Sequence, residues 1–154
     1  AVASQSDLRV FALDSSPMML KIALEHIATS HLVRKVVPVL GDVHSIPFED
    51  ETIDIVFSRG SWFFWEDLSQ AFWEIYRVLT PGGIAYIGGG FGNSHLKKKI
   101  FNAMKEKDSD FEKGVQKRLE KNSPELIRRE IEKTPVRSYD LIHDESGFWA
   151  VIKK

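Results

Sequence analysis

The sequence contains no cysteine, which excludes disulfide bonds and metal sites built on thiolates. Its five histidines lack the spacings typical of metal ligands, with Asp42 and His44 coming closest, so we predict no metal site. No apolar run reaches the roughly 18 residues that a membrane span requires, and no secretory signal is recognisable. We therefore expect a cytoplasmic protein with no membrane partner.

Glycine is absent from the thirteen residues that precede Asp14, and these end in the apolar strand predicted over residues 8–13. An acid that closes a buried strand and faces a helix start is where mononucleotide-binding sheets hold a ribose diol. In such folds a glycine-rich loop, which holds the other end of the ligand, comes roughly 20 residues earlier. The sequence therefore shows one half of a nucleotide site without the glycine-rich half.

The composition is that of an ordinary globular protein, with 43% hydrophobic and 28% charged residues in a chain of 154. This length suits one domain over residues 1–154. Residues 94–133 carry 12 Lys/Arg against 8 Asp/Glu. Such a segment either meets an acidic partner or nucleic acid, or forms a solvated helical face. With no nucleic-acid motif in the chain, we favour the solvated face and expect no nucleic-acid partner.

Apolar runs alternate with helical periodicity along most of the chain. Further strands are predicted over residues 36–40, 53–57 and 84–87, and helices follow Ser16-Pro17 and cover residues 68–79. Residues 94–133 are predicted to be helical with breaks around Gly114 and Asn122, and the last two strands, 139–143 and 148–152, to form an antiparallel hairpin. This order predicts an α/β fold with a doubly wound, mostly parallel sheet and a final hairpin.

Three predicted strands end in polar residues, namely Asp14, Asp42 and the pair Ser58-Arg59. Ligands of open α/β sheets bind outside the carboxyl ends of the strands. A carboxylate at Asp14 can accept hydrogen bonds from vicinal hydroxyls, and one at Asp42 from an exocyclic amine such as that of adenine. The backbone amide of Val43 can donate to a ring nitrogen. Singly, each acid reads as a helix cap or turn residue; together they favour an adenosine site.

The chain resembles the class I S-adenosylmethionine-dependent methyltransferases, especially the small-molecule subgroup similar to ubiquinone/menaquinone-biosynthesis methyltransferases. The resemblance covers about residues 8–90, and its four pieces occur in the family's order. They are Val10-Phe11-Ala12-Leu13-Asp14-Ser15-Ser16-Pro17-Met18-Met19-Leu20, Gly41-Asp42-Val43-His44-Ser45-Ile46-Pro47-Phe48, Thr52-Ile53-Asp54-Ile55-Val56-Phe57-Ser58 and Glu74-Ile75-Tyr76-Arg77-Val78-Leu79-Thr80-Pro81-Gly82-Gly83.

The resemblance implies a Rossmann-like methyltransferase that binds S-adenosylmethionine and a small-molecule methyl acceptor. Asp14 would bind the ribose hydroxyls, and Asp42 the adenine amine beside a backbone contact from Val43. Residues 94–133 would form a helical insertion near the substrate site, and no catalytic residue is assigned. The remaining cofactor-binding residues would be Ser15 and Met19 along the pocket, and Ser58 and Arg59 near the methionine part and the substrate entrance.

The sequence departs from the family where the family has its first strand and its Asp/Glu-x-Gly-x-Gly-x-Gly loop, which hold the methionine part of the cofactor. That strand lies in the family between the strand ending at Asp14 and strand 53–57. Its loss would remove on the order of 10 kcal/mol of apolar burial. We therefore expect a truncated domain with weak or absent cofactor binding. The gap would close by pairing of the flanking strands or by strand exchange in a homodimer.

Two other functions stay open. The run Gly88–Gly92 follows a strand and precedes lysines, as a phosphate-binding loop does, and would make the protein a nucleotide- or dinucleotide-binding protein. We favour a flexible strand exit beside the active-site mouth. A non-catalytic assembly module is the other alternative. The aromatic cluster of residues 62–65 either packs the next helix or forms an apolar wall for a substrate or a sulfonium.

Overall fold

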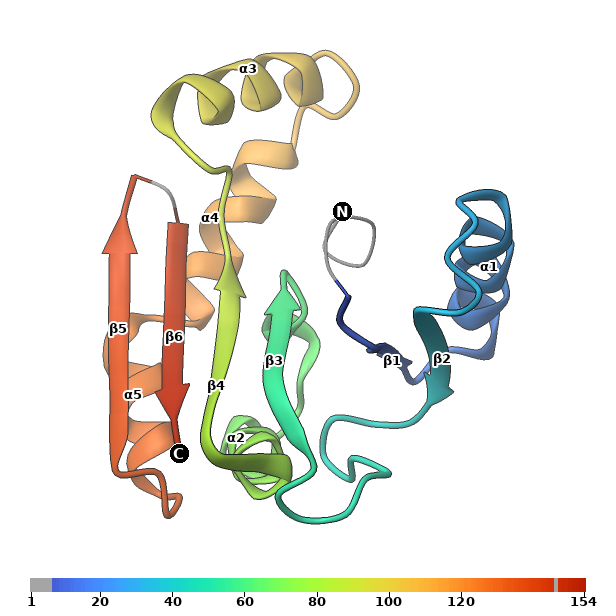
Figure 1. The fold of residues 1–154 in the computed structure, drawn as a ribbon. Helices are drawn as coiled ribbons and strands as arrows, with labels where there is room; N and C mark the ends of the chain where they lie inside the picture. The colour runs from blue at the N-terminus through green and yellow to red at the C-terminus, as the bar shows by residue number, and fades with distance from the viewer. Residues whose placement is uncertain (1–6, 146) are drawn as a thin grey trace. The chain divides into compact units, whose positions relative to one another are not determined.

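The structure is a computed structural model that describes residues 7–145 and 147–154. The chain divides into two compact units, of which unit 1 ends at Pro47 and unit 2 comprises Phe48–Lys154. Figure 1 shows the helices and strands of both units. The prediction of one domain over residues 1–154 stays a prediction.

Unit 1 contains a parallel pair of strands, β1 (Val10–Asp14) and β2 (Val36–Leu40), joined by helix α1 (Pro17–Thr29). The predicted strand 8–13 is confirmed with a shift, because β1 begins at Val10 and includes Asp14. Helix α1 begins as predicted: the Ser16 side chain accepts a hydrogen bond from the Met19 amide at 3.3 Å, and proline occupies the first turn.

Unit 2 contains a four-stranded sheet in the order β3-β4-β6-β5 (Figure 1). Strands β3 (Ile53–Arg59) and β4 (Leu79–Gly89) are parallel. The predicted hairpin is confirmed as β5 (Ser138–Asp144) and β6 (Gly147–Lys153), and its second strand, β6, pairs antiparallel with β4. Together with the parallel β1–β2 pair, the fold is α/β and Rossmann-like.

The helices of unit 2 follow the predicted pattern, except that one predicted break lies at a different place. The 3-10 helix η1 covers Trp62–Phe64 and helix α2 covers Leu68–Val78. Gly114 does not interrupt a helix, because it lies inside α4 and the break falls at residues 106–110. The break at Asn122 is confirmed, and the Ser123 side chain caps the last helix. These helices are α3 (Ser94–Lys105), α4 (Phe111–Lys121) and α5 (Pro124–Glu132).

Strand β4 starts directly after α2, earlier than the predicted residue 84. Leu79 lies opposite Ile53, and the register then moves to Ile84 opposite Ile55, with the Pro81-Gly82-Gly83 segment accommodated in between. The predicted helix stop is therefore correct. The extra length of β4 comes from pairing with β3 on both sides of the proline–glycine segment.

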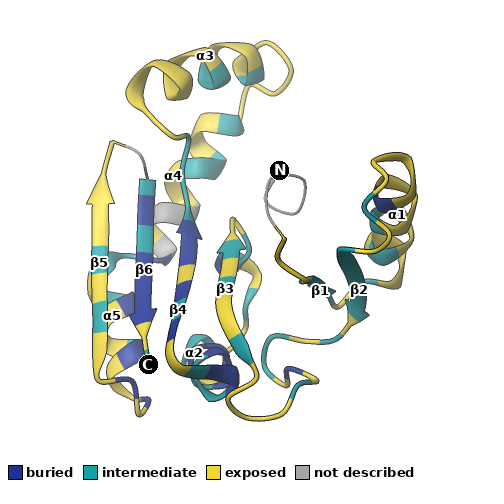
Figure 2. Cartoon of the chain, in the orientation of Figure 1, coloured by how far each residue is buried: buried dark blue, intermediate teal, exposed yellow. Residues whose placement is uncertain are grey.

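The hydrophobic core lies mainly in unit 2, where α2 and α5 cover the sheet (Figure 2). Unit 1 supplies only Ile27 and Ile46 to the buried apolar residues of the described chain. Within unit 1, β1 pairs with β2. The expected pairing of the strands that flank the missing one concerns two different units and stays a prediction. Strand exchange in a homodimer stays a prediction. The largest fully buried side chains are Trp62, Phe72, Ile75, Val78, Leu79, Ile87, Ile127, Ile131 and Ile152.

Within the part of the chain that the structure describes, no helix combines the length and apolar character needed to cross a membrane.

Candidate functional site

The first candidate site lies at one edge of unit 1, where β1 and β2 end. The strands run parallel, so both carboxyl ends reach the same edge, with Asp14 opposite Leu40. The Gly41 amide donates to the Asp14 carbonyl oxygen at 3.1 Å. This pairing places Asp14 beside the turn that carries Asp42, so the structure brings these two predicted site residues together.

Asp14 is half-buried and connects β1 to the start of α1. Its Oδ1 accepts a hydrogen bond from the Ser16 amide at 2.8 Å. Ser15 lies between β1 and the N-cap of α1, and Met19 lies in the first turn of the helix; both are exposed, with 49% of Met19 accessible to solvent. One carboxylate oxygen of Asp14 therefore binds the backbone of the helix start, and the exposed side chains of Ser15 and Met19 follow it in the chain.

Asp42 is exposed and forms a turn with His44. Its Oδ1 accepts from the His44 amide at 2.8 Å and also contacts His44 Nδ1. These two hydrogen bonds lower the pKa of Asp42, and the bond from the His44 backbone amide contributes most. Val43 is half-buried between them. His44 also belongs to this site, although from the sequence it was considered only as a metal ligand. Its spacing of two residues from Asp42 could have indicated this turn.

Gly41 fixes how the turn leaves β2. A Cβ at this position would lie 2.7 Å from Leu13 Cδ1 and 2.8 Å from Pro47 Cδ, which is closer than real contacts. Only glycine therefore lets the chain pass between these two side chains. This requirement gives a physical reason for the glycine in the Gly41-Asp42 segment of the resemblance.

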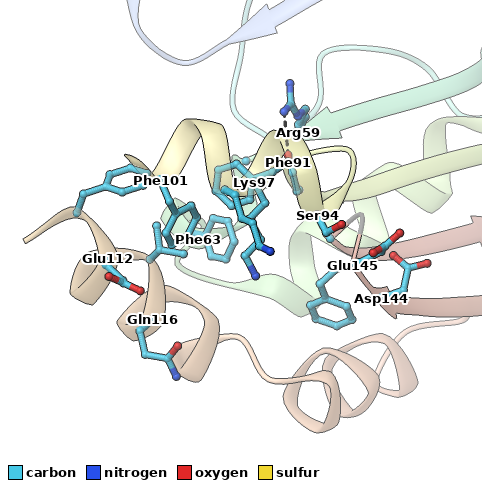
Figure 3. Close-up of a pocket in the computed structure, with 18 of the residues that line it drawn as sticks. Arg59, Phe63, Phe91, Ser94, Lys97, Phe101, Glu112, Gln116, Asp144 and Glu145 are labelled. Atoms are coloured by element: carbon cyan, nitrogen blue, oxygen red, sulfur yellow. Dashed lines mark hydrogen bonds between the residues drawn. The ribbon is translucent and has the colours of Figure 1, made fainter. Parts of the chain in front are cut away.

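Ser58 and Arg59 lie at the end of β3, in unit 2. Ser58 is half-buried, and Arg59 Nη2 donates to the Gly90 carbonyl oxygen at 2.8 Å. Arg59 thereby joins the end of β3 to the glycine run after β4 (Figure 3). Their predicted place beside Asp14 and Asp42 stays a prediction, because the two pairs belong to different units.

A cavity of about 990 Å³ opens in unit 2 where β3, β4 and the β5–β6 hairpin meet α3 and α4 (Figure 3). Its wall is strongly aromatic and also carries charges of both signs. The resemblance predicts residues 94–133 near a substrate site, and of their side chains only the lysines that follow the glycine run were considered as ligand-binding groups. The residues that line the cavity include Arg59, Phe63, Phe64, Phe91, Ser94, Lys97, Lys98, Phe101, Phe111, Glu112, Asp144, Glu145 and Phe148.

The aromatic cluster of residues 62–65 divides between packing and the cavity: packing on the next helix is confirmed for Trp65, and the role as a wall for a substrate or a sulfonium stays a prediction. Trp62 is buried and packs on Phe148 with ring centroids 5.0 Å apart, while Trp65 packs edge-to-face on Phe72. Phe63 and Phe64 instead line the cavity. The tryptophans thus anchor the segment, and the two phenylalanines form part of an apolar wall.

The glycine run Gly88–Gly92 begins inside β4, and its first glycine is required for packing against the neighbouring strand. The Gly88 carbonyl oxygen accepts from the Gly60 amide at 2.6 Å, and its φ of +154° disfavours other residues. A Cβ there would lie 2.2 Å from the Phe148 carbonyl oxygen on the neighbouring strand β6. Since Gly89 and Gly90 line the cavity, the run is a strand exit at the cavity mouth.

The charged residues Glu74 and Arg77 of α2 form a structural network. Arg77 donates to both carboxylate oxygens of Glu74, each at 2.8 Å, and to the Phe48 carbonyl and Asp50. These hydrogen bonds, with Glu74 contributing most, raise the pKa of Arg77. Thr80 donates to Asp54 at 3.1 Å and ties β4 to β3. Among the described residues, no cluster of histidine and acidic side chains suits a metal ion.

Comparison with known proteins relates this geometry to one family. Residues 1–87 match the family described as a methyltransferase domain. A solved structure from Methanococcus maripaludis, provisionally assigned as an S-adenosyl-L-methionine-dependent methyltransferase, is 44% identical with a TM-score of 0.95, and the match covers 100% of this chain and 70% of that one.

Two further relatives are more distant. The malonyl-[acyl-carrier protein] O-methyltransferase of Serratia marcescens is 40% identical over 76 residues, 49% of this chain and 28% of the relative. The phosphoethanolamine N-methyltransferase 2 of Haemonchus contortus, solved with phosphomonomethylethanolamine and S-adenosylhomocysteine, is 27% identical with a TM-score of 0.65, covering 92% of this chain and 31% of that one. The chain thus spans only part of these relatives, and the family match covers more than half of the chain. By sequence and by fold, the chain belongs to the methyltransferase domain family.

Proposed function

We propose that this domain serves S-adenosylmethionine-dependent methyl transfer to a small molecule and that the edge of unit 1 binds the adenosine part of the cofactor. The observation that carries the proposal is the parallel β1–β2 pairing, which sets Asp14 and Asp42 at one strand edge. Ligand sites of α/β folds lie at such carboxyl ends. The match to the methyltransferase domain supports this assignment.

The two carboxylates suit the two ends of an adenosine. Asp14 uses one oxygen for the Ser16 amide, which leaves the other to accept from ribose hydroxyls. Asp42, like any aspartate of ordinary or lowered pKa, is a carboxylate at neutral pH and can accept from the adenine amine. Val43 would add a backbone contact, and the exposed Met19 an apolar surface.

The methyl-transfer end of the site belongs to unit 2 in this proposal. S-adenosylmethionine, when bound, supplies an activated methyl group on a sulfonium. Ser58 and Arg59 at the end of β3 would hold the methionine part, and the neighbouring cavity would hold the acceptor. Methyl transfer is an in-line displacement, so positioning and exclusion of water supply much of its acceleration. A small-molecule acceptor also accords with the Haemonchus contortus neighbour, whose complex contains phosphomonomethylethanolamine.

The adenosine site can be tested with residues 1–154, since Asp14, Asp42 and Val43 all lie in unit 1. We expect adenosine to bind weakly, because these three residues contact only this part of the cofactor in the proposal. Two-dimensional ¹H–¹⁵N NMR detects millimolar binding. Adding adenosine should shift the amides of Asp14, Asp42 and Val43, and Asp14→Asn should weaken this response.

The control is Asp110→Asn, since Asp110 is an exposed acid in the 106–110 segment. This variant should leave the adenosine response unchanged. Adenosine that shifts no amide at the β1–β2 edge, or that binds equally well to Asp14→Asn, would overturn the adenosine site. Selective binding of ATP that is lost in Gly90→Val would instead favour the phosphate-loop alternative.

A further inference from the structure

We propose that the cavity of unit 2 selects acceptors that join a flat apolar body to an anionic group and that Lys97 determines this selectivity. The proposal rests on the proposed function, because it names the substrate class of the same acceptor site. It depends on three features of the cavity: its aromatic wall, the position of the Lys97 ammonium group and the arrangement of the other charges.

The aromatic wall can cover the apolar body. Phe101 packs edge-to-face against Phe91 and Phe111, with ring centroids 5.2 and 5.5 Å apart. All three rings are only half-buried although they line the same cavity. Apolar area that stays in contact with water gains free energy when a ligand covers it. Edge-to-face rings also leave flat faces for a planar ligand.

Lys97 places a positive charge against this wall. Its Nζ lies 5.7 Å from the centre of the Phe101 ring, and Figure 3 shows the side chain extending into the cavity with Phe101 and Glu112 on one side and Asp144 and Glu145 on the other. Lys97 is exposed and forms no ion pair with a described residue. Its ammonium group is therefore accessible to a ligand anion beside an apolar surface.

The other charges decide between an anionic and a cationic ligand. The lining acids would suit a cation, but Lys97 already occupies the aromatic face where a ligand ammonium would bind. A second cation, Arg59, is held in the wall by its hydrogen bond to Gly90. Ser94 adds a hydroxyl donor at the first turn of α3, where the helix dipole favours negative charge. These donors on the β3 and α3 side of the cavity favour an anionic group.

The test uses three probes with the same ring and different charge: 2-naphthoate, 2-naphthalenemethanol and 2-naphthylmethylamine. Binding to the full chain is followed from the NMR shifts of α3 and α4 amides. We expect 2-naphthoate to bind most tightly. Lys97→Met should weaken 2-naphthoate about fivefold, as expected for one exposed charge pair, and should leave the neutral probe unchanged.

Two variants control for structure. Lys97→Arg keeps the charge and should retain the preference for 2-naphthoate, while Lys99→Met removes a lysine of α3 that does not line the cavity and should change nothing. Equal binding of the three probes, tightest binding of the amine, no binding of any probe, or an unchanged 2-naphthoate affinity in Lys97→Met would overturn the proposal. The experiment needs no cofactor, so a failed adenosine test refutes the cofactor site without altering this result.

Discussion

Replacing Arg77 with leucine should destabilise unit 2 strongly, because Arg77 balances a nearly buried carboxylate. The Glu74 side chain is 10% exposed, and Arg77, itself 18% exposed, gives it two hydrogen bonds of 2.8 Å. Arg77→Leu leaves this charge without its main partner. The substitution also removes the bond to the Phe48 carbonyl, which ties the start of unit 2 to α2.

The expected loss can be estimated from how deeply the pair is buried. Removing one partner of a buried pair costs about 3–5 kcal/mol, whereas replacing both partners by apolar residues is often neutral. Since Arg77 is partly accessible, we expect about 3 kcal/mol for Arg77→Leu. For the double variant Glu74→Leu/Arg77→Leu we expect about 1 kcal/mol, because no buried unpaired charge remains and Asp50, which also loses Arg77, is exposed to solvent.

Urea unfolding followed by tryptophan fluorescence reports on the unfolding of unit 2, because all four tryptophans lie in that unit. With a slope of about 2 kcal/mol per molar urea, the midpoint of Arg77→Leu should fall by about 1.5 M. The reasoning would be refuted if the double variant lost as much free energy of unfolding as the two single variants lose together. That result would mean that the two side chains stabilise the fold independently rather than as a pair.

Two further predictions follow from the geometry of single residues. Gly88→Ala should lower the free energy of unfolding by about 2 kcal/mol or more in the same urea assay, since its Cβ would meet the Phe148 carbonyl in a backbone region that favours glycine; wild-type stability would contradict this. His44→Ala should raise the pKa of Asp42 only part of the way, because it removes the imidazole contact but keeps the larger contribution of the His44 backbone amide; ¹³C NMR of the Asp42 carboxyl group follows the titration. Because the folded-state pKa is the lower one, the stabilisation from Asp42 is present above about pH 3.9 and is lost as the pH falls through the folded-state pKa. An unchanged titration midpoint would show that the His44 imidazole does not stabilise this charge.

Local patterns in the sequence predicted most elements correctly. Ser16-Pro17 and Ser123-Pro124 begin helices in the structure because a serine cap and a first-turn proline act through neighbouring residues. Gly114 misled the prediction, since the packing of α4 accepts the modest cost of one helical glycine. The predicted grouping of strand-end residues is found for Asp14 and Asp42, where one parallel pairing suffices to bring them together.

The cavity of unit 2 could be predicted much less well from the sequence. Nothing in the local pattern separates Trp62, which is buried, from Phe63, which lines the cavity. Likewise, Lys97 is one of three consecutive lysines, and only the packing of α3 against the cavity distinguishes it from Lys99. Such assignments depend on contacts between residues far apart in the chain.

The sequence by itself determined the α/β class, the helix starts and the ordered segments of a methyltransferase domain, because these depend on short-range periodicity, capping and spacing. Only the tertiary structure decided that β6 lies between β4 and β5, that Gly88 must be glycine where β4 meets β6, and that Lys97 reaches an aromatic cavity. Strand order and cavity lining arise from hydrogen bonds and packing between distant segments. A single sequence does not encode these contacts in any local pattern.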